Sequence, residues 1–244
     1  MKKGGLFSLF IFFGFFSLSI LQAQELWANS PFKSKPALAL SPSSYPADKK
    51  NLAKLLILRA KEQIERKQWK KAYLLLKKAQ SLQPKNGEVY KLLADSYILC
   101  QNHRKALLAY RQAVKLEPTN PDFWMALGLE EEHLNMAKKA LESFKEATLL
   151  KPTAQSWYHL GIAYMTLNRY NEALYPLEKA NQLDPGFIDA RHSLGLCYEK
   201  LGKKEAAHQA FSKAYLLNPT NAILQQNLLR ITNAGTQNKP KSKP

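Results

Sequence analysis

The chain repeats one pattern of apolar and small residues about every 34 residues. The clearest copy consists of Trp157, Leu160, Gly161, Tyr164, Ala173, Leu177, Ala180 and Pro185. The next copy has Leu194, Gly195, Tyr198, Ala207, Phe211, Ala214 and Pro219. Two earlier copies have Trp124, Leu127, Gly128, Ala140, Phe144, Ala147 and Pro152, and Tyr90, Leu93, Ala94, Tyr97, Ala106, Tyr110, Ala113 and Pro118. A weaker copy ends with Ala72, Leu76, Ala79 and Pro84. Such a period predicts a stack of similar units.

Each copy predicts a pair of helices. Trp157, Leu160 and Gly161 lie at helical offsets and share one face, and Ala173 and Leu177 share a face of a second helix. Small residues let the two backbones approach closely, while larger side chains fill the remaining space. The unit is therefore a helical hairpin, which buries its apolar face by stacking on its neighbours.

The ends of these helices are marked by proline and asparagine. The proline that closes each copy has no amide hydrogen and breaks the helix there. In the stretch Pro118 to Asp122, Asn120 is predicted to cap the next helix and Pro121 to occupy its first turn.

This spacing resembles the tetratricopeptide repeat. The resemblance implies an all-α, right-handed solenoid of five helical hairpins over residues 52–233, completed by a C-terminal capping helix. The predicted hairpins cover 53–86, 87–120, 121–153, 154–187 and 188–221, and the capping helix covers 222–233. In the family, the first helices of the hairpins line a concave groove.

The groove positions are those on the first helices that do not pack against the partner helix. They are Met125, Leu129, Glu132, His133, Tyr158, His159, Ile162, Met165, His192, Leu196 and Glu199. The middle of this set is apolar and adaptable, which suits an amphipathic helix or an extended peptide with apolar anchors. The alternative is that several of them pack against neighbouring repeats as core.

Some family members bind the C-terminal carboxylates of chaperones through Lys, Asn and Arg on these same helices. The corresponding positions here include Ile57, Lys61, Lys91, Leu92, Asp95, Asp122 and Ala126. They do not reproduce that set, so a chaperone carboxylate clamp is not expected.

The two ends of the chain differ from the repeats. Lys2 and Lys3 followed by the apolar run from Leu6 to Leu21 predict a secretory signal over residues 1–23, or an uncleaved anchor. Residues 24–51 are rich in Pro and Ser and are predicted to be a linker without a helical stripe. Residues 234–244 are predicted to be a disordered basic tail. The protein is therefore expected to be exported, to the periplasm or cell envelope of a bacterium, or secreted.

The positive charge is unevenly distributed. The formal net charge is +17, and residues 53–86 alone carry ten Lys or Arg against two Asp or Glu. The central repeats are nearly neutral, so no continuous phosphate track is expected and nucleic acid is not an expected partner. The first repeat is instead interpreted as a polar end cap with an apolar stripe of Leu52, Leu56, Ala60 and Ile64, and its basic residues as a candidate contact with an anionic membrane surface.

No catalytic motif is present: the sequence has no Gly-rich phosphate loop, nucleophile elbow or His-Glu-x-x-His. No cofactor is expected, and His133, His159 and His192, on successive first helices, are predicted to be too far apart for one metal ion. The acidic run Glu130 to Glu132 is predicted to face mostly solvent. Cys100 and Cys197 are predicted to be buried, unpaired thiols.

These observations predict a non-enzymatic protein-interaction scaffold of the cell envelope that binds a peptide or helix of another protein. Two alternatives remain. One is a basic module that binds an anionic surface (lipid, glycan or nucleic acid) through the first repeat and the tails. The other is a self-assembling subunit of an envelope complex, whose oligomeric state the sequence leaves open.

Overall fold

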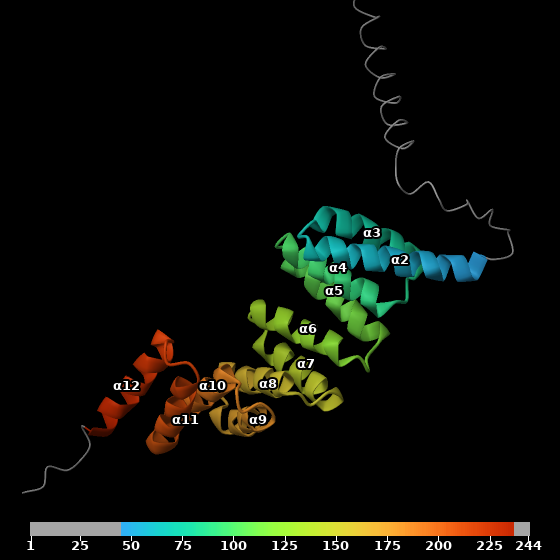
Figure 1. Cartoon of the computed structure of the whole chain (residues 1–244). Helices are drawn as coiled ribbons and strands as arrows, with labels where there is room; N and C mark the ends of the chain where they lie inside the picture. The colour runs from blue at the N-terminus through green and yellow to red at the C-terminus, as the bar shows by residue number, and fades with distance from the viewer. Residues whose placement is uncertain (1–44, 237–244) are drawn as a thin grey trace, which may run out of the picture. The chain divides into compact units, whose positions relative to one another are not determined.

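The predicted all-α solenoid of helical hairpins is confirmed. A computed structural model describes residues 45–236, and between these residues the chain forms α-helices and no strand (Figure 1). The helices are α2 (Tyr45–Glu65), α3 (Trp69–Leu82), α4 (Gly87–Leu99), α5 (His103–Leu116), α6 (Pro121–His133), α7 (Ala137–Leu150), α8 (Ala154–Thr166), α9 (Tyr170–Leu183), α10 (Ile188–Lys200), α11 (Lys204–Leu217) and α12 (Ala222–Thr236). The predicted signal segment and residues 237–244 lie outside the described residues, so export stays a prediction.

The first and last helices are longer than the sequence predicted. Helix α2 begins at Tyr45, so the end of the predicted 24–51 linker is helical. Pro46 is compatible with this start because a helix leaves its first amide groups unpaired, and proline has none to lose. Helix α12 starts at the predicted residue and continues to Thr236, past the predicted end at 233.

The two helices of each hairpin are joined by the same tight turn. Five residues in these turns have positive φ angles: Lys67, Gln101, Asn135, Asn168 and Gly202. Gly and Asn adopt this left-handed conformation most readily, whereas Lys and Gln do so at some cost in backbone energy. The packing of the two helices therefore determines the turn conformation, even where Lys or Gln is the residue with the positive φ angle.

The second helix of every hairpin stops two residues before the repeat's proline, as the sequence predicted. The helices end at Leu82, Leu116, Leu150, Leu183 and Leu217, ahead of Pro84, Pro118, Pro152, Pro185 and Pro219. A proline disfavours helical geometry at the residue before it and cannot donate its own amide. Asn120 caps α6 by accepting a hydrogen bond from the Asp122 amide at 3.1 Å, and Pro121 occupies the first turn. Both predictions are confirmed.

The core is continuous from one hairpin to the next. Helices α4 and α5, α6 and α7, α8 and α9, and α10 and α11 pack as hairpins, and each second helix also packs on the following first helix. Helix α12 packs on α11 and covers the last hairpin, as predicted for a capping helix. Apolar side chains from three successive helices meet in each cluster, so no hairpin buries its own apolar face alone.

Each of the last three hairpins has a glycine pressed against a large side chain of its partner helix. A Cβ atom added to Gly128 would lie 2.6 Å from Cε1 of Phe144. The same overlap, also at 2.6 Å, arises between Gly195 and Phe211. These glycines allow the first helix to lie directly on the ring, so the ring fills the space that a methyl group would take.

The prediction that the acidic run faces solvent is wrong for Glu130 and Glu131, which are both buried. Glu131 accepts hydrogen bonds from Arg111 Nη2 at 3.0 Å and from Ser143 Oγ at 2.8 Å. Glu130 Oε1 lies 3.0 Å from His103 Nδ1. The carboxylates can be buried because α5 and α7 supply polar partners at the positions that α6 faces. Only Glu132 is partly exposed.

The apolar stripe predicted for the first repeat is found at Leu56, Ala60 and Ile64, which lie in or against one core cluster, but not at Leu52. Leu56 and Ala60 are buried with Ala53 and Ile57, whereas Leu52 is exposed. The buried face of the helix is therefore wider than the predicted stripe, because Ala53 and Ile57 also belong to it. Its basic side chains are exposed, as predicted for the residues of an end repeat.

The two cysteines are unpaired thiols, and only Cys197 is fully buried. Its thiol donates a hydrogen bond to the Tyr170 carbonyl at 3.0 Å. Burial raises the pKa of the Cys197 thiol to about 11. Cys100, at the end of α4, is partly exposed, so the prediction that both cysteines are buried is wrong for this one.

Candidate functional site

The predicted groove residues lie on α6, α8 and α10, the first helices of the last three hairpins. Leu129 and His133 are exposed, and the other nine are partly buried. We call the surface formed by α2, α4, α6, α8 and α10 the first-helix face, and that formed by α3, α5, α7, α9 and α11 the second-helix face. The groove residues on the first-helix face fall into two parts, which differ in how much their own neighbours cover them.

The more open part is a hollow of about 600 Å³ that spans α2, α4 and α6. We call it the first-helix hollow. Its lining consists of Lys61, Asn86, Glu88, Lys91, Leu92, Glu117, Asn120, Asp122, Phe123, Met125, Ala126 and Leu129. It shares Met125 and Leu129 with the predicted groove. The structure therefore extends the candidate site toward the N-terminus, over two helices from which the sequence analysis chose no groove residue.

The repeat spacing could have indicated two of the lining residues that the predicted groove lacks, Lys61 and Lys91. Counting back one repeat from Met125 and Leu129 gives Lys91 and Asp95 on α4, and a further repeat gives Ile57 and Lys61 on α2. All four positions were predicted to lie on first helices and not to form a carboxylate clamp. Of these, Lys61 and Lys91 line the hollow, and neither was included in the predicted groove.

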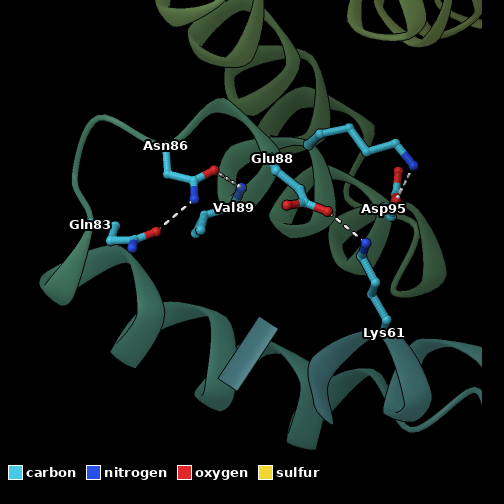
Figure 2. A network of polar contacts seen from close by, with 7 residues as sticks. Lys61, Gln83, Asn86, Glu88, Val89 and Asp95 are labelled. Carbon is cyan, nitrogen blue, oxygen red and sulfur yellow. Dashed lines mark hydrogen bonds and ion pairs between the residues drawn. The ribbon is translucent and has the colours of Figure 1, made fainter. Parts of the chain in front are cut away.

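The charges at the edge of the hollow are paired (Figure 2). Lys61 Nζ lies 2.6 Å from Glu88 Oε1, and Lys91 Nζ lies 2.8 Å from Asp95 Oδ2. Asp95 Oδ1 also accepts a hydrogen bond from the Tyr110 hydroxyl at 2.7 Å. Burial, followed by the charge of Asp95, raises the pKa of Tyr110, so its hydroxyl remains a donor. Each lysine has a carboxylate neighbour, and Glu117 and Asp122 also line the hollow, so its lining carries a small net negative charge.

The hollow has an ordered rim and an apolar floor. Asn86 caps α4 by accepting from the Val89 amide and donates to Gln83 Oε1 at 2.7 Å (Figure 2). The Gly87 amide donates to Glu117 Oε1 at 2.8 Å, which ties the start of α4 to the end of α5. Between these polar groups lie Leu92, Phe123, Met125, Ala126 and Leu129. Such a surface can accept apolar side chains while its rim hydrogen-bonds to a polypeptide backbone.

The part of the predicted groove on α8 and α10 is more occupied by its own neighbours. The rings of His159 and Phe144 stack with centroids 5.3 Å apart, and Tyr158 lies 4.9 Å from the Phe187 ring. Tyr158 and Met165 pack against the cluster of Ala173, Leu177 and Cys197, and Leu196 packs against that of Phe211.

The capping helix engages two further groove residues. His192 Nε2 lies 2.8 Å from Asn227 Nδ2, so the histidine accepts and the amide donates. Glu199 Oε2 accepts from Arg230 Nη2 at 2.8 Å. These contacts fix the end of α10 against α12, and a partner would have to bind beside them or displace them.

Two partly buried histidines make the stability of this part depend on pH. Burial lowers the pKa of both His159 and His192 below the ordinary value of 6.5. Near pH 6.5 these histidines bind protons in the unfolded chain but not in the folded chain. The free energy of unfolding is therefore highest above that pH and decreases as the pH falls below it. We expect the free energy of unfolding from urea titration to fall between about pH 7.5 and about pH 6.0.

A double variant tests this assignment. His159→Gln/His192→Gln is expected to lose less stability over the same pH interval than the unsubstituted chain. The matched control is His208→Gln, because His208 is exposed on α11. An unchanged pH dependence in the double variant would contradict the assignment.

The described residues contain no group of three or more His, Cys, Asp or Glu that could hold a metal ion. Within the same residues, no helix is both long enough and apolar enough to cross a membrane.

Sequence comparison identifies the repeat. Models of the tetratricopeptide repeat match residues 63–130, 154–187 and 188–221, which together make up more than half of the chain. The chain belongs to the tetratricopeptide-repeat family. Stacks of such repeats present extended surfaces on which other proteins bind, so the chain is by class a protein-interaction scaffold.

Solved structures share the fold at low sequence identity. YrrB, described as a TPR protein with an unusual peptide-binding site, is 21% identical with a TM-score of 0.64, covering 73% of this chain and 90% of YrrB. MamA of Desulfovibrio magneticus RS-1 is 20% identical with a TM-score of 0.64, covering 70% and 97%. PilF of Pseudomonas aeruginosa is 17% identical with a TM-score of 0.68, covering 78% and 86%.

A similar sequence occurs in a plant protein. The tetratricopeptide repeat domain-containing protein PYG7 of Arabidopsis thaliana, a chloroplast protein, is 31% identical over 70 residues. The match covers 29% of this chain and only 23% of PYG7. It therefore concerns the repeats and not the whole of either protein.

Proposed function

We propose that this protein is a non-enzymatic scaffold that binds a peptide segment or amphipathic helix of another protein on its first-helix face. The observation that carries the proposal is the first-helix hollow, with apolar side chains between polar groups that include two lysine–carboxylate pairs. Its volume of about 600 Å³ lies within the range of pockets that bind ligands.

The chemistry of the hollow favours a partner with apolar anchors. Leu129 is 40% exposed and Met125 partly exposed, so both offer apolar surface to a partner. Methionine adapts its shape to different side chains, which suits a site that accepts a segment of varied sequence. Because Lys61 and Lys91 are each paired with a carboxylate, acidic groups of a partner gain little from these two lysines.

A solved structure with the same fold also supports peptide binding. YrrB, which shares the fold, is described as having a peptide-binding site. At this level of identity the likeness concerns the fold alone, so the residues that bind must be identified in this chain.

Leu129→Asp tests the proposal. Peptides would first be selected from a random library on the purified chain, and their affinity measured by fluorescence anisotropy. We expect Leu129→Asp to weaken the selected peptides at least about tenfold, because the carboxylate would be buried against apolar anchors without a partner. Tyr158→Ala, measured in parallel, shows whether α8 takes part in the same site.

The matched control is Leu149→Asp on α7. Leu149 is 78% exposed and lies on the second-helix face, so the same substitution there should leave affinity unchanged. Equal losses in the two variants, or none in Leu129→Asp, would show that the hollow is not the binding site.

A further inference from the structure

The exposed side of α3 carries four lysines around one leucine. Leu74 is 68% exposed, and Lys70, Lys71, Lys77 and Lys78 lie three or four residues from it on either side. Residues at these spacings share one helix face. All four lysines are exposed.

Helix α5 repeats this arrangement at the same places in the next hairpin. Leu108 is 65% exposed, with Arg104 and Lys105 preceding it at the same spacings. A hollow of about 250 Å³ joins the two helices, because Lys77 of α3 and both Lys105 and Leu108 of α5 line it together with Tyr90 and Tyr97 of α4. We call this combined surface the basic leucine face: Lys70, Lys71, Leu74, Lys77, Lys78, Arg104, Lys105 and Leu108.

The positive charge of this face is not neutralised by the protein itself. Among the described residues, the ion pairs within 4.0 Å involve none of its six basic side chains. Lys77 Nζ instead donates to Gln80 Oε1 at 2.7 Å, and Lys70 and Lys105 lie over the rings of Trp69 and Tyr97. The sequence from Arg66 to Gly87 contains no acidic residue.

The arrangement is confined to the first two hairpins. At the place of Leu74 and Leu108, α7 has Glu142, which pairs with Lys145 at 3.2 Å. On α9 the same place has the exposed Tyr175, but acidic residues, Glu172 and Glu178, lie three residues on either side of it. Solubility alone would not call for an exposed leucine at the centre of each basic cluster. The combination of leucine and unpaired lysines is therefore specific to α3 and α5.

We propose that the basic leucine face docks on an anionic lipid bilayer. Lysine side chains can reach the phosphate groups of the lipids while their methylene chains remain in apolar surroundings. The two leucines enter the boundary between headgroups and acyl chains, as apolar residues of interfacial helices do. A soluble polyanion would satisfy the lysines and leave the leucines in water, so the exposed leucines select the bilayer.

Vesicle sedimentation with the full chain tests this. Lys70→Gln/Lys71→Gln/Lys77→Gln/Lys78→Gln would be compared with the unsubstituted chain on phosphatidylcholine vesicles with and without about 30% phosphatidylglycerol. Each lysine near an anionic surface contributes about fivefold to partitioning, so we expect the loss of four lysines to weaken binding to the anionic vesicles about 600-fold. Both chains should bind the neutral vesicles equally, because any contribution of residues 1–44 is common to them.

The control variant also removes four positive charges, but from lysines outside the basic leucine face. Lys138→Gln/Lys139→Gln/Lys200→Gln/Lys213→Gln changes four exposed lysines outside the face and should retain binding within about threefold. A loss as large as that of the first variant would overturn the proposal, because net charge alone would then explain it. Wild-type binding by the first variant, with both variants folded by circular dichroism, would overturn it as well.

The leucines distinguish a bilayer from a soluble polyanion. Leu74→Ser/Leu108→Ser should weaken vesicle binding about tenfold and leave binding to heparin unchanged. If the leucine variant binds vesicles as tightly as the unsubstituted chain, the face recognises charge only, and the assignment to a bilayer is wrong.

Discussion

Phe144→Ala is expected to lower the free energy of unfolding by about 3–5 kcal/mol. Phe144 is fully buried between the two helices of the third hairpin, and its ring also stacks on His159 of the following hairpin. Removal of the ring leaves a cavity at a point where Gly128 has no side chain to fill it. The measurement is urea unfolding followed by circular dichroism.

Leu149→Ala provides the comparison on the same helix. Because Leu149 is mostly exposed, this change should cost less than about 0.5 kcal/mol. Gly128→Ala, Phe144→Leu and the pair Gly128→Ala/Phe144→Leu form a double-mutant cycle: the new methyl group should be destabilising beside Phe144 and tolerated beside the smaller side chain. Additive effects, or a cost below about 1 kcal/mol for Phe144→Ala, would contradict the close packing of ring and glycine.

Glu131→Ala is expected to lower the free energy of unfolding by about 2 kcal/mol. The Glu131 side chain is buried and accepts from both Arg111 and Ser143. Its loss leaves the Ser143 hydroxyl buried without that acceptor. Arg111 is 38% exposed and can turn to water, so the cost is smaller than for a fully buried ion pair.

The matched measurements separate charge from hydrogen bonding. Glu131→Gln keeps an acceptor for Ser143 and should cost less than Glu131→Ala. Glu146→Ala on α7 removes an exposed carboxylate and should have little effect. If Glu131→Ala is as stable as the unsubstituted chain in urea unfolding, the buried network does not stabilise the junction of α5, α6 and α7.

The fold was predictable because its determinants are local and repeated. The prolines stop the second helices, Asn120 caps α6, and the spacing of glycine and aromatic residues aligns Gly128 with Phe144. Each of these effects acts within one hairpin, and the repetition of the pattern made it visible. The helix start at Tyr45 was missed because a proline-rich composition indicates a linker even where the last proline occupies a helix's first turn.

The candidate site was predictable only in part. Met125 and Leu129 were predicted and line the first-helix hollow, whereas Lys61 and Lys91 were assigned to first helices and not to the groove. An apolar stripe indicates which residues of one helix could touch a partner. It does not indicate how three neighbouring helices leave space between them, and the hollow depends on that space.

The sequence by itself determined the repeat, the helices and the apolar partners within each hairpin, because these depend on spacing along one or two helices. Tertiary structure decided the rest. Glu130 and Glu131 are buried because helices on both sides bring His103, Arg111 and Ser143 to them. The lysines of α3 and α5 form one face because α4 holds the two helices side by side. Neither effect is visible in a single stretch of sequence, because the charge of a residue does not reveal which residues of other helices will stand opposite it.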